Sequence, residues 1–362
     1  MVRIKSVYLL AVAFFLAPMQ VQTKEDHTDT LKLLHIIFRH GDRTPSIQDN
    51  EFVLNTNVTY IDAVLTQKGK ENSYLLGKWL QNRYAKFLRS YSTDSVQAIT
   101  TFYERTQVSL QLVLEGMFSF TNSSKTWDLE NNEIHFSIKN LPLNNSLLML
   151  PHESCTNFFT YYNDYTKTES YKNMLTKYTD LNEYLKIHIN KTFSSLAEFV
   201  VLYDTLSTQK EIGLSLIPWA DILIKKLEPS VIDLCLASTA TKELKTIMIG
   251  EFVKNLVETA TLKFEHQLEP NDRKLFIYSA HDLNIYAVLQ LFKYDVKARP
   301  SYNSCVMIEA HTVDNVDGFK VFYKNSLDEK VVPVPIPNCG LFCPLRTFSK
   351  NYEEYFFTFD TC

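Results

Sequence analysis

A histidine stands between two arginines in the segment Arg39-His40-Gly41-Asp42-Arg43-Thr44-Pro45, which directly follows an apolar run at residues 33–38. A guanidinium can bind two phosphate oxygens at once, and a glycine lets the backbone come close to an anion. A neutral imidazole can attack phosphorus, which divides one difficult displacement into two easier ones. Two neighbouring cations would lower the pKa of a purely structural histidine without any structural gain. The segment therefore predicts a phosphate site, with His40 as nucleophile and Arg39 and Arg43 as anion ligands, rather than a solvated basic turn.

Two other predicted strands end before side chains of the same kind. The strand predicted at residues 96–102 leads into Arg105, and the one at 275–278 leads into the pair His281-Asp282. A helical pattern follows each of them. Ligands of open α/β sheets bind at the edge formed by the carboxyl ends of the strands. We therefore expect all these side chains to share one edge of a sheet.

The chain contains two kinds of segment, strand-loop-helix units and a long helical stretch, which together predict an α/β domain with an insertion. Residues 24–145 and 250–362 contain the strand-loop-helix units, and Thr66 is the expected N-cap of the first helix. Residues 146–249 are rich in tyrosine and mostly helical in period, which predicts a helical cap inserted into the sheet domain. Only 8 glycines occur in 362 residues, so a compact body is favoured over domains on flexible linkers.

Residues 1–23 have the pattern of a secretory signal peptide. Arg3 and Lys5 precede a largely apolar segment that is shorter than the roughly 20 apolar residues of a membrane span. No later segment is long and apolar enough to act as a membrane anchor. We therefore expect a soluble protein that is secreted or, alternatively, resides in the lysosomal lumen.

The balance of charges argues against nucleic acid as a partner. The formal charge is -4, and loss of the two basic residues in the signal segment would make it about -6. Nucleic-acid binding requires a basic stripe, which a mildly acidic chain does not favour.

Sequons and cysteines agree with an oxidising compartment. Four Asn-x-Ser/Thr sequons predict glycosylation at Asn57, Asn122, Asn144 and Asn190. The chain has 6 cysteines, an even set that predicts three disulfides among 15 connectivities. Sequence proximity alone singles out the pair Cys339–Cys343. No matching Cys/His pair accompanies it, so we expect no metal there.

The motif Arg-His-Gly-x-Arg-x-Pro resembles the signature of the histidine acid phosphatases, which include prostatic, lysosomal and insect venom enzymes. Glu104-Arg105-Thr106 is similar to the Asp-Arg-Thr element of that family, with Glu in place of Asp. Residues 278–282 are similar to its His-Asp segment, although Leu283-Asn284 replaces the usual threonine that follows. Residues 216–220 resemble its Leu-Pro-x-Trp segment, with the proline moved by one position.

This resemblance implies a mixed sheet with flanking helices, an inserted cap, and a site that works without a cofactor. It implies that Arg39, Arg43, Arg105 and His281 bind the phosphate and that Asp282 protonates the leaving oxygen. Trp219 would line the substrate pocket, or else pack within the cap. Asp42 is interpreted as a structural residue of the loop. The disulfides implied are Cys155–Cys362, Cys235–Cys305 and Cys339–Cys343.

The sequence thus predicts a secreted, metal-independent acid phosphatase that forms a phosphohistidine and acts on small phosphate monoesters or phosphoproteins. An acidic optimum is expected, because Asp282 can donate a proton only while it is protonated. A phytase-like member and a secreted non-catalytic binding protein on the same fold are the alternatives. The oligomeric state stays open, a homodimer included.

Overall fold

The computed structural model describes residues 28–46, 62–89, 92–118, 138–142, 148–216, 218–358 and 362. The expected signal segment and the sequons at Asn57, Asn122 and Asn144 lie outside these residues. Asn190 is described and exposed, at the end of a cap helix.

The apolar run after the signal segment forms β1 (Leu31–Arg39), a central strand of the sheet. In the described residues the sheet has eight strands, with the order β3-β2-β4-β1-β5-β6-β7 and with β8 also paired to β6. The strands β1 to β4 run parallel where they pair, while β5 is antiparallel to β1 and β6 to β5, so the sheet is mixed, as expected. The other strands are β2 (Val96–Thr100), β3 (Ile138–Asn140), β4 (Leu275–Ala280), β5 (Cys305–Val313), β6 (Val316–Lys324), β7 (Val332–Pro333) and β8 (Cys343–Pro344).

The register of the parallel strands brings their ends to one edge. Arg39 pairs with Ala280 between β1 and β4, and Thr100 pairs with Ser279 between β2 and β4. The residues that follow these three strands therefore emerge side by side.

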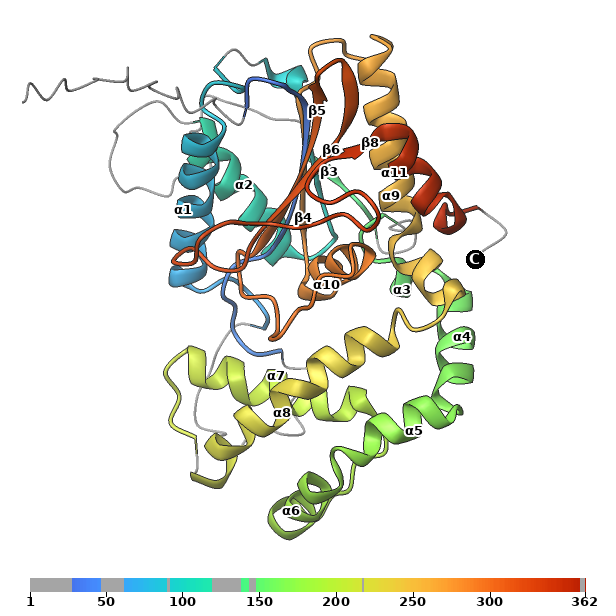
Figure 1. Ribbon diagram of the computed structural model, residues 1–362. Helices are drawn as coiled ribbons and strands as arrows, with labels where there is room; N and C mark the ends of the chain where they lie inside the picture. Colours follow the sequence, from blue (N-terminus) through green and yellow to red (C-terminus); the bar gives the residue numbers. More distant parts are fainter. Residues whose placement is uncertain are drawn as a thin grey trace, which may run out of the picture.

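Helices cover both faces of the sheet (Figure 1). One face carries α1 (Gln67–Arg83), which begins at the N-cap Thr66 as expected, and α2 (Glu104–Phe118). The other face carries α9 (Lys242–Phe264), α10 (Asp282–Leu291) and α11 (Leu345–Tyr352). Because side chains alternate along a strand, β1 supplies a core to each face.

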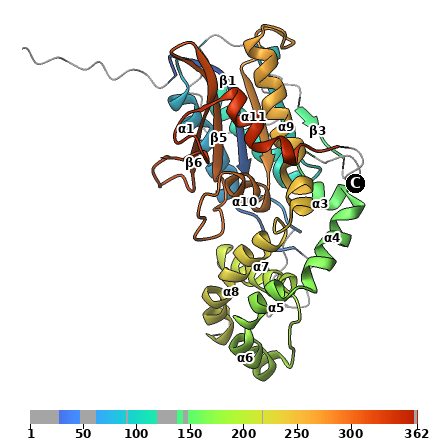
Figure 2. The same ribbon diagram turned by 45° about the vertical axis from the view of Figure 1, so that its right-hand side comes forward.

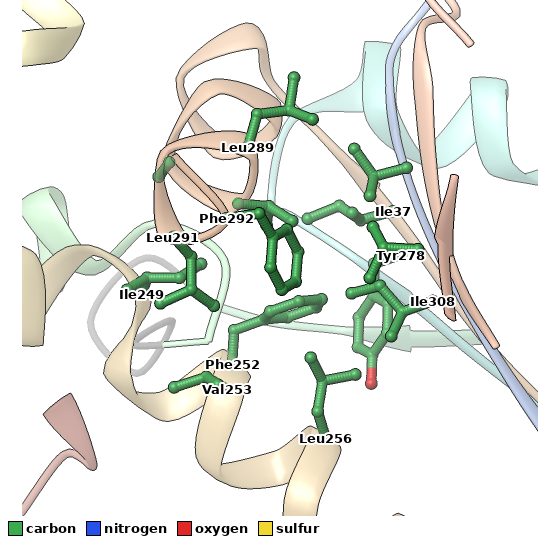
Figure 3. Close-up of a cluster of buried hydrophobic side chains, with 14 of the residues drawn as sticks. Ile37, Ile249, Phe252, Val253, Leu256, Tyr278, Leu289, Leu291, Phe292 and Ile308 are labelled. Carbon is green, nitrogen blue, oxygen red and sulfur yellow. The ribbon is translucent and has the colours of Figure 1, made fainter. Parts of the chain in front are cut away.

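On the face of α9 and α10, Ile37 from β1 and Ile308 from β5 pack with Phe252 and Leu256 (Figure 3). On the opposite face, Leu34, Ile36 and Phe38 join the α1–α2 core. Burial of both cores fixes the register of β1 and hence the position of the residues that follow it.

Five helices between the sheet strands form the cap, which lies beyond the sheet edge where β1 and β4 end (Figure 2). They have a hydrophobic core of their own. The predicted boundary of the cap at residue 249 falls inside α9. The α9 residues of the sheet core begin at Ile249, whereas Leu244, Ile247 and Met248 pack with Cys155 and Phe158, so the boundary stays a prediction. The cap helices are α4 (Thr156–Thr166), α5 (Glu169–Thr176), α6 (Thr179–Ile189), α7 (Leu196–Glu211) and α8 (Pro218–Ala237). Short helical turns are η2 (Thr93–Ser95), α3 (Pro151–Ser154) and η4 (Glu353–Tyr355). None of the described helices has the length and hydropathy to cross a bilayer.

Two of the three disulfides implied by the resemblance are present, Cys155–Cys362 and Cys339–Cys343. The third prediction is wrong, because Cys235 and Cys305 are both free thiols and buried. Cys235 lies in the core under α9 and α10, whereas Cys305 belongs to the core under α1 and α2. The sheet separates these two cores, so the two sulfur atoms do not meet.

Candidate active site

The loop that carries the histidine leaves β1 between two neighbouring strands. The Arg39 amide donates to Ser304 O at 2.9 Å, and the His40 amide donates to Ala280 O at 3.0 Å. The Asn303 amide in turn donates to Arg39 O at 3.2 Å. These main-chain bonds extend the sheet pairing by one residue and fix the direction in which the His40 side chain leaves the backbone.

Gly41 lets this loop press against the start of α1. A Cβ atom at this position would lie 2.4 Å from Gly69 O and 2.8 Å from Ser73 Oγ, so no larger residue fits without a shift of the backbone. The Gly41 amide donates to Ser109 Oγ of α2 at 3.0 Å. The glycine of the motif thus places the loop against both helices of this face.

Asp42 points toward α1. Its Oδ1 lies 3.0 Å from Lys68 Nζ, and its Oδ2 accepts from Asn72 Nδ2 at 3.1 Å. Its carbonyl accepts from the Thr66 amide at 2.9 Å. These contacts hold the loop to the helix start, in agreement with the structural interpretation of Asp42.

His40 is buried, with its two ring nitrogens in different settings. Nδ1 lies 2.9 Å from Gly41 O, and because a carbonyl only accepts, Nδ1 carries the proton. Nε2 therefore keeps its lone pair, and Arg105 Nε donates to it at 3.3 Å. Burial, followed by the charge of Arg105, holds the pKa of His40 well below the ordinary value. The free imidazole is thus neutral at neutral and mildly acidic pH.

Arg105 and His281 complete this side of the site. The Arg105 guanidinium lies 4.2 Å over the Tyr103 ring, and burial together with Arg43 lowers its pKa to about 10, at which it still carries its charge in acid. The ring centroid of His281 lies 5.4 Å from that of His40, and His281 Nε2 is 3.2 Å from Thr101 Oγ1. Burial, then Arg105, keeps the pKa of His281 well below its usual range.

Asp282 is the first residue of α10, and both of its carboxylate oxygens have partners. Oδ1 accepts from the Leu283 amide at 2.9 Å, while Oδ2 pairs with Arg299 Nε and lies 3.4 Å from an Arg39 nitrogen. Burial alone would raise the pKa of Asp282, but Arg299 and Arg39 outweigh it and hold this pKa well below the ordinary value. In the free protein Asp282 is therefore a carboxylate.

The departure from the family pattern after Asp282 has a structural counterpart. Asn284 Oδ1 accepts from the His281 amide at 3.1 Å, and its Nδ2 donates to Met149 O at 2.7 Å. The asparagine thus provides a hydrogen-bond acceptor for a main-chain amide at the start of α10 and ties this helix to a neighbouring loop.

Three side chains at the site lie outside the sequence motifs: Asp204, Arg299 and Tyr302. Asp204, from the middle of α7, pairs with Arg43 through one oxygen and with Arg299 at 3.0 Å through the other. The Tyr302 ring lies under the Arg39 guanidinium at 3.8 Å, and burial raises the pKa of its hydroxyl to about 12. In the sequence, Asp204 could have been recognised as a candidate site residue because it is a charged residue among the apolar residues of a helical pattern, between Tyr203 and Leu206. Arg299 precedes a proline and lies outside every motif, so no sequence pattern indicates that it belongs to the site.

Trp219 packs against other residues of the cap. Its ring stacks on His188 with centroids 5.0 Å apart, and Tyr184 Oη donates to its carbonyl at 3.4 Å. A place for Trp219 in the substrate pocket stays a prediction. In the described part of the chain, no three His, Cys, Asp or Glu side chains are grouped as metal ligands.

Comparison with known proteins shows which family and which proteins this chain is similar to. Residues 30–317 match the model of the histidine phosphatase superfamily (branch 2). The venom acid phosphatase Acph-1 of Apis mellifera is 27% identical over 90% of this chain and 85% of its own. Human prostatic acid phosphatase is 27% identical over 95% and 89%, and the Xenopus laevis lysosomal acid phosphatase is 28% identical over 94% and 79%.

Solved structures agree in fold. The phytase of Klebsiella sp. ASR1 superimposes with a TM-score of 0.68 at 13% identity, covering 90% of this chain and 96% of that one. The Citrobacter braakii phytase gives a TM-score of 0.62 at 16% identity, covering 90% and 98%.

Proposed function

Since the chain belongs to branch 2 of the histidine phosphatase superfamily and is a phosphatase, we propose that it hydrolyses phosphate monoesters in acid through a phosphohistidine on His40. The observation that carries this proposal is the state of the His40 ring. Its proton is held on Nδ1 by Gly41 O, and the lone pair on Nε2 faces the Arg105 guanidinium. A phosphate held by Arg105 would bring its phosphorus to the nucleophilic nitrogen.

The net charge of the side chains that contact one another at the site supports the proposal that the ligand is a dianion. Four arginines, two aspartates and two neutral histidines leave a formal charge of +2, which matches a phosphate monoester dianion; they are Arg39, Arg43, Arg105, Arg299, Asp204, Asp282, His40 and His281. Guanidiniums that are fixed before the substrate arrives can stabilise the charge spread over the equatorial oxygens of the transition state.

The reaction proceeds in two displacements. In the first, His40 Nε2 forms a bond to phosphorus while the bond from phosphorus to the ester oxygen breaks, and Asp282 gives its proton to that oxygen. In the second, a water oxygen attacks phosphorus, Asp282 takes up a proton from the water, and the electron pair of the N–P bond returns to Nε2. Orthophosphate leaves, and the site is restored.

An acidic optimum follows from coupling between the substrate and Asp282. In the free protein, Arg299 and Arg39 keep Asp282 ionised. A bound dianion places negative charge beside the same arginines and so raises the pKa of Asp282. Substrate binding is then accompanied by proton uptake, which acid favours, while the lowered pKa of His40 keeps the nucleophile neutral.

Small phosphate monoesters and phosphoproteins are the proposed substrates, and a secreted or lysosomal location is proposed with them. The secretory pattern of residues 1–23, the disulfide Cys155–Cys362 and the exposed Asn190 support passage through an oxidising, glycosylating compartment. The relatives include a venom and a lysosomal acid phosphatase, which supports the same proposal.

A phytase-like activity is the second candidate, because the solved structures with the same fold include phytases. Two of the site's arginines, Arg43 and Arg299, are already paired with Asp204. Fewer cations are thus left for the additional phosphates of inositol hexakisphosphate, which favours the monoesterase.

The test is turnover of p-nitrophenyl phosphate at acidic pH with EDTA present, compared with phosphate release from inositol hexakisphosphate. We expect the monoester to be hydrolysed without added metal and the hexakisphosphate to be a poor substrate. His40→Ala should lower kcat by about 10³-fold or more and abolish acid-quenched labelling of histidine. His266→Asn, at an exposed histidine just after α9, is the control and should leave kcat nearly unchanged. Near-normal turnover by His40→Ala, or dependence on added metal, would overturn the proposal.

A further inference from the structure

We propose that Arg299 is a positioning residue that holds the proton donor Asp282 and, through Asp204, ties it to the cap helix α7. The proposal rests on the function proposed above, because it assigns a role to Arg299 in the same reaction.

Five side chains of alternating charge run in sequence through the site. Arg39 contacts Asp282, Asp282 contacts Arg299, Arg299 contacts Asp204, and Asp204 contacts Arg43. Both ends of this series, Arg39 and Arg43, belong to the motif at residues 39–45. Arg299 is therefore the central residue in a series of ion pairs that starts and ends at the motif.

The shape of the guanidinium suits this position. Nε binds Asp282 and a terminal nitrogen binds Asp204, so one planar group spans two carboxylates. The Arg299 side chain is only 14% exposed, and those of Asp204 and Asp282 are 11% and 19% exposed. The compact ammonium of a lysine carries the same charge but has no rigid fork with which to span both carboxylates.

Arg299 also joins the sheet to the cap. It precedes β5 in the sheet domain, and its guanidinium carbon lies 5.5 Å from the centroid of the Tyr203 ring on α7. Its Nε and one terminal nitrogen are engaged by protein carboxylates. It is thus set to orient Asp282 and the cap rather than to bind phosphate as Arg105 does.

The charges around Asp282 predict how its protonation depends on this residue. Arg39 faces Asp282 from β1, His40 from the following loop, Arg299 from the segment before β5, Asp204 from α7 and Cys235 from α8. Without Arg299, one of the two nearby guanidiniums is lost while the negative charge of Asp204 remains. The pKa of Asp282 then rises, and the carboxyl loses a fixed orientation.

The experiment compares Arg299→Gln and Arg299→Lys with Arg346→Gln, an exposed arginine on α11, as control. The rates are measured for p-nitrophenyl phosphate, which has a good leaving group, and for glycerol 2-phosphate, whose alkoxide needs a proton. At pH 5 we expect Arg299→Gln to lower kcat for glycerol 2-phosphate ~10–100-fold and that for p-nitrophenyl phosphate ~3-fold or less. The descending limb of the glycerol 2-phosphate profile should move about one pH unit upward.

Arg299→Lys should restore the position of the descending limb but only part of kcat, because the charge returns without the fork. It also decides the matter if Arg299→Gln does not fold. Equal losses for both esters with an unshifted pH profile would overturn the proposal and leave Arg299 a structural residue. A wild-type protein without turnover would instead overturn the proposed function, and this role with it.

Discussion

The sheet edge and the cap contribute to the site in different ways. His40, Arg105 and His281 each follow a strand of the parallel part of the sheet, and main-chain pairing sets their relative positions. The cap contributes Asp204 from the middle of α7, and its place depends on two ion pairs. The difference teaches that backbone register positions the residues proposed to bind and attack phosphate. Side chains from a second region instead adjust the surroundings of the proposed proton donor, Asp282.

The two regions also differ in what stabilises them. The sheet has a core on each face, and β1 contributes to both, whereas the cap is built around its own aromatic and aliphatic cluster. A substitution within the cap core can therefore leave the strand ends in place. The ion pairs of Asp204 are the contacts through which a change in the cap would reach the reaction.

The largest effect is expected at the sheet edge, from removal of the proton donor. Asp282→Asn should lower kcat for glycerol 2-phosphate by about 10²–10⁴-fold, because the departing alkoxide no longer receives a proton. The loss for p-nitrophenyl phosphate should be much smaller. Steady-state kinetics with both esters provide the measurement, and Asp180→Asn, an exposed aspartate of α6, is the control. Equal losses for the two esters would show that Asp282 does not protonate the leaving group.

A second expectation concerns the pH dependence of the nucleophile. A histidine with an unshifted pKa of about 6.5 would be only ~1% neutral at pH 4.5, a loss of about 100-fold in the reactive form. Burial and Arg105 hold the pKa of His40 well below that value, so kcat/KM should show no such loss. The measurement is kcat/KM from pH 7 to 4.5, corrected for ionisation of the substrate. A bend near pH 6.5 that survives this correction would contradict the environment described for His40.

The smallest effect is expected from a substitution in the cap, which should lower kcat for glycerol 2-phosphate about tenfold. Asp204→Asn removes a negative charge that faces Asp282, so the pKa of Asp282 falls and less of the carboxyl is protonated. The descending limb for glycerol 2-phosphate should move to lower pH, opposite to the shift expected for Arg299→Gln. Orthophosphate should inhibit more strongly, because the net charge of the site becomes more positive. A shift of both variants in the same direction would show that the two regions are not coupled through charge.

The site residues that follow the strands could be predicted from the sequence because short local patterns indicate them. An apolar run followed by Arg-His-Gly, and two more strands followed by charged residues, indicate which side chains meet at a sheet edge. The family, the mixed sheet and the phosphatase class predicted from these residues are confirmed. The N-cap at Thr66 is confirmed for the same local reason.

The remaining features depend on long-range packing that a single sequence does not encode in any local pattern. Arg299 is recognisable as a site residue only once α7 brings Asp204 to it, across 95 residues of sequence. Cys235 and Cys305 match a family pairing by order, yet the sheet lies between them.

The disulfide between Cys155 and Cys362 joins residues 207 positions apart and closes a covalent ring that contains the cap. His281, Asp282, Arg299 and Asp204 lie on this ring, whereas Arg39, His40, Arg43 and Arg105 lie on the open segment before it. A single proteolytic cut anywhere in the ring would therefore release no fragment, and Asp282 would stay covalently linked to the strand that precedes His40. Reduction would remove this covalent link, so a cut between Cys155 and His281 would then leave Asp282 and His40 on separate chains.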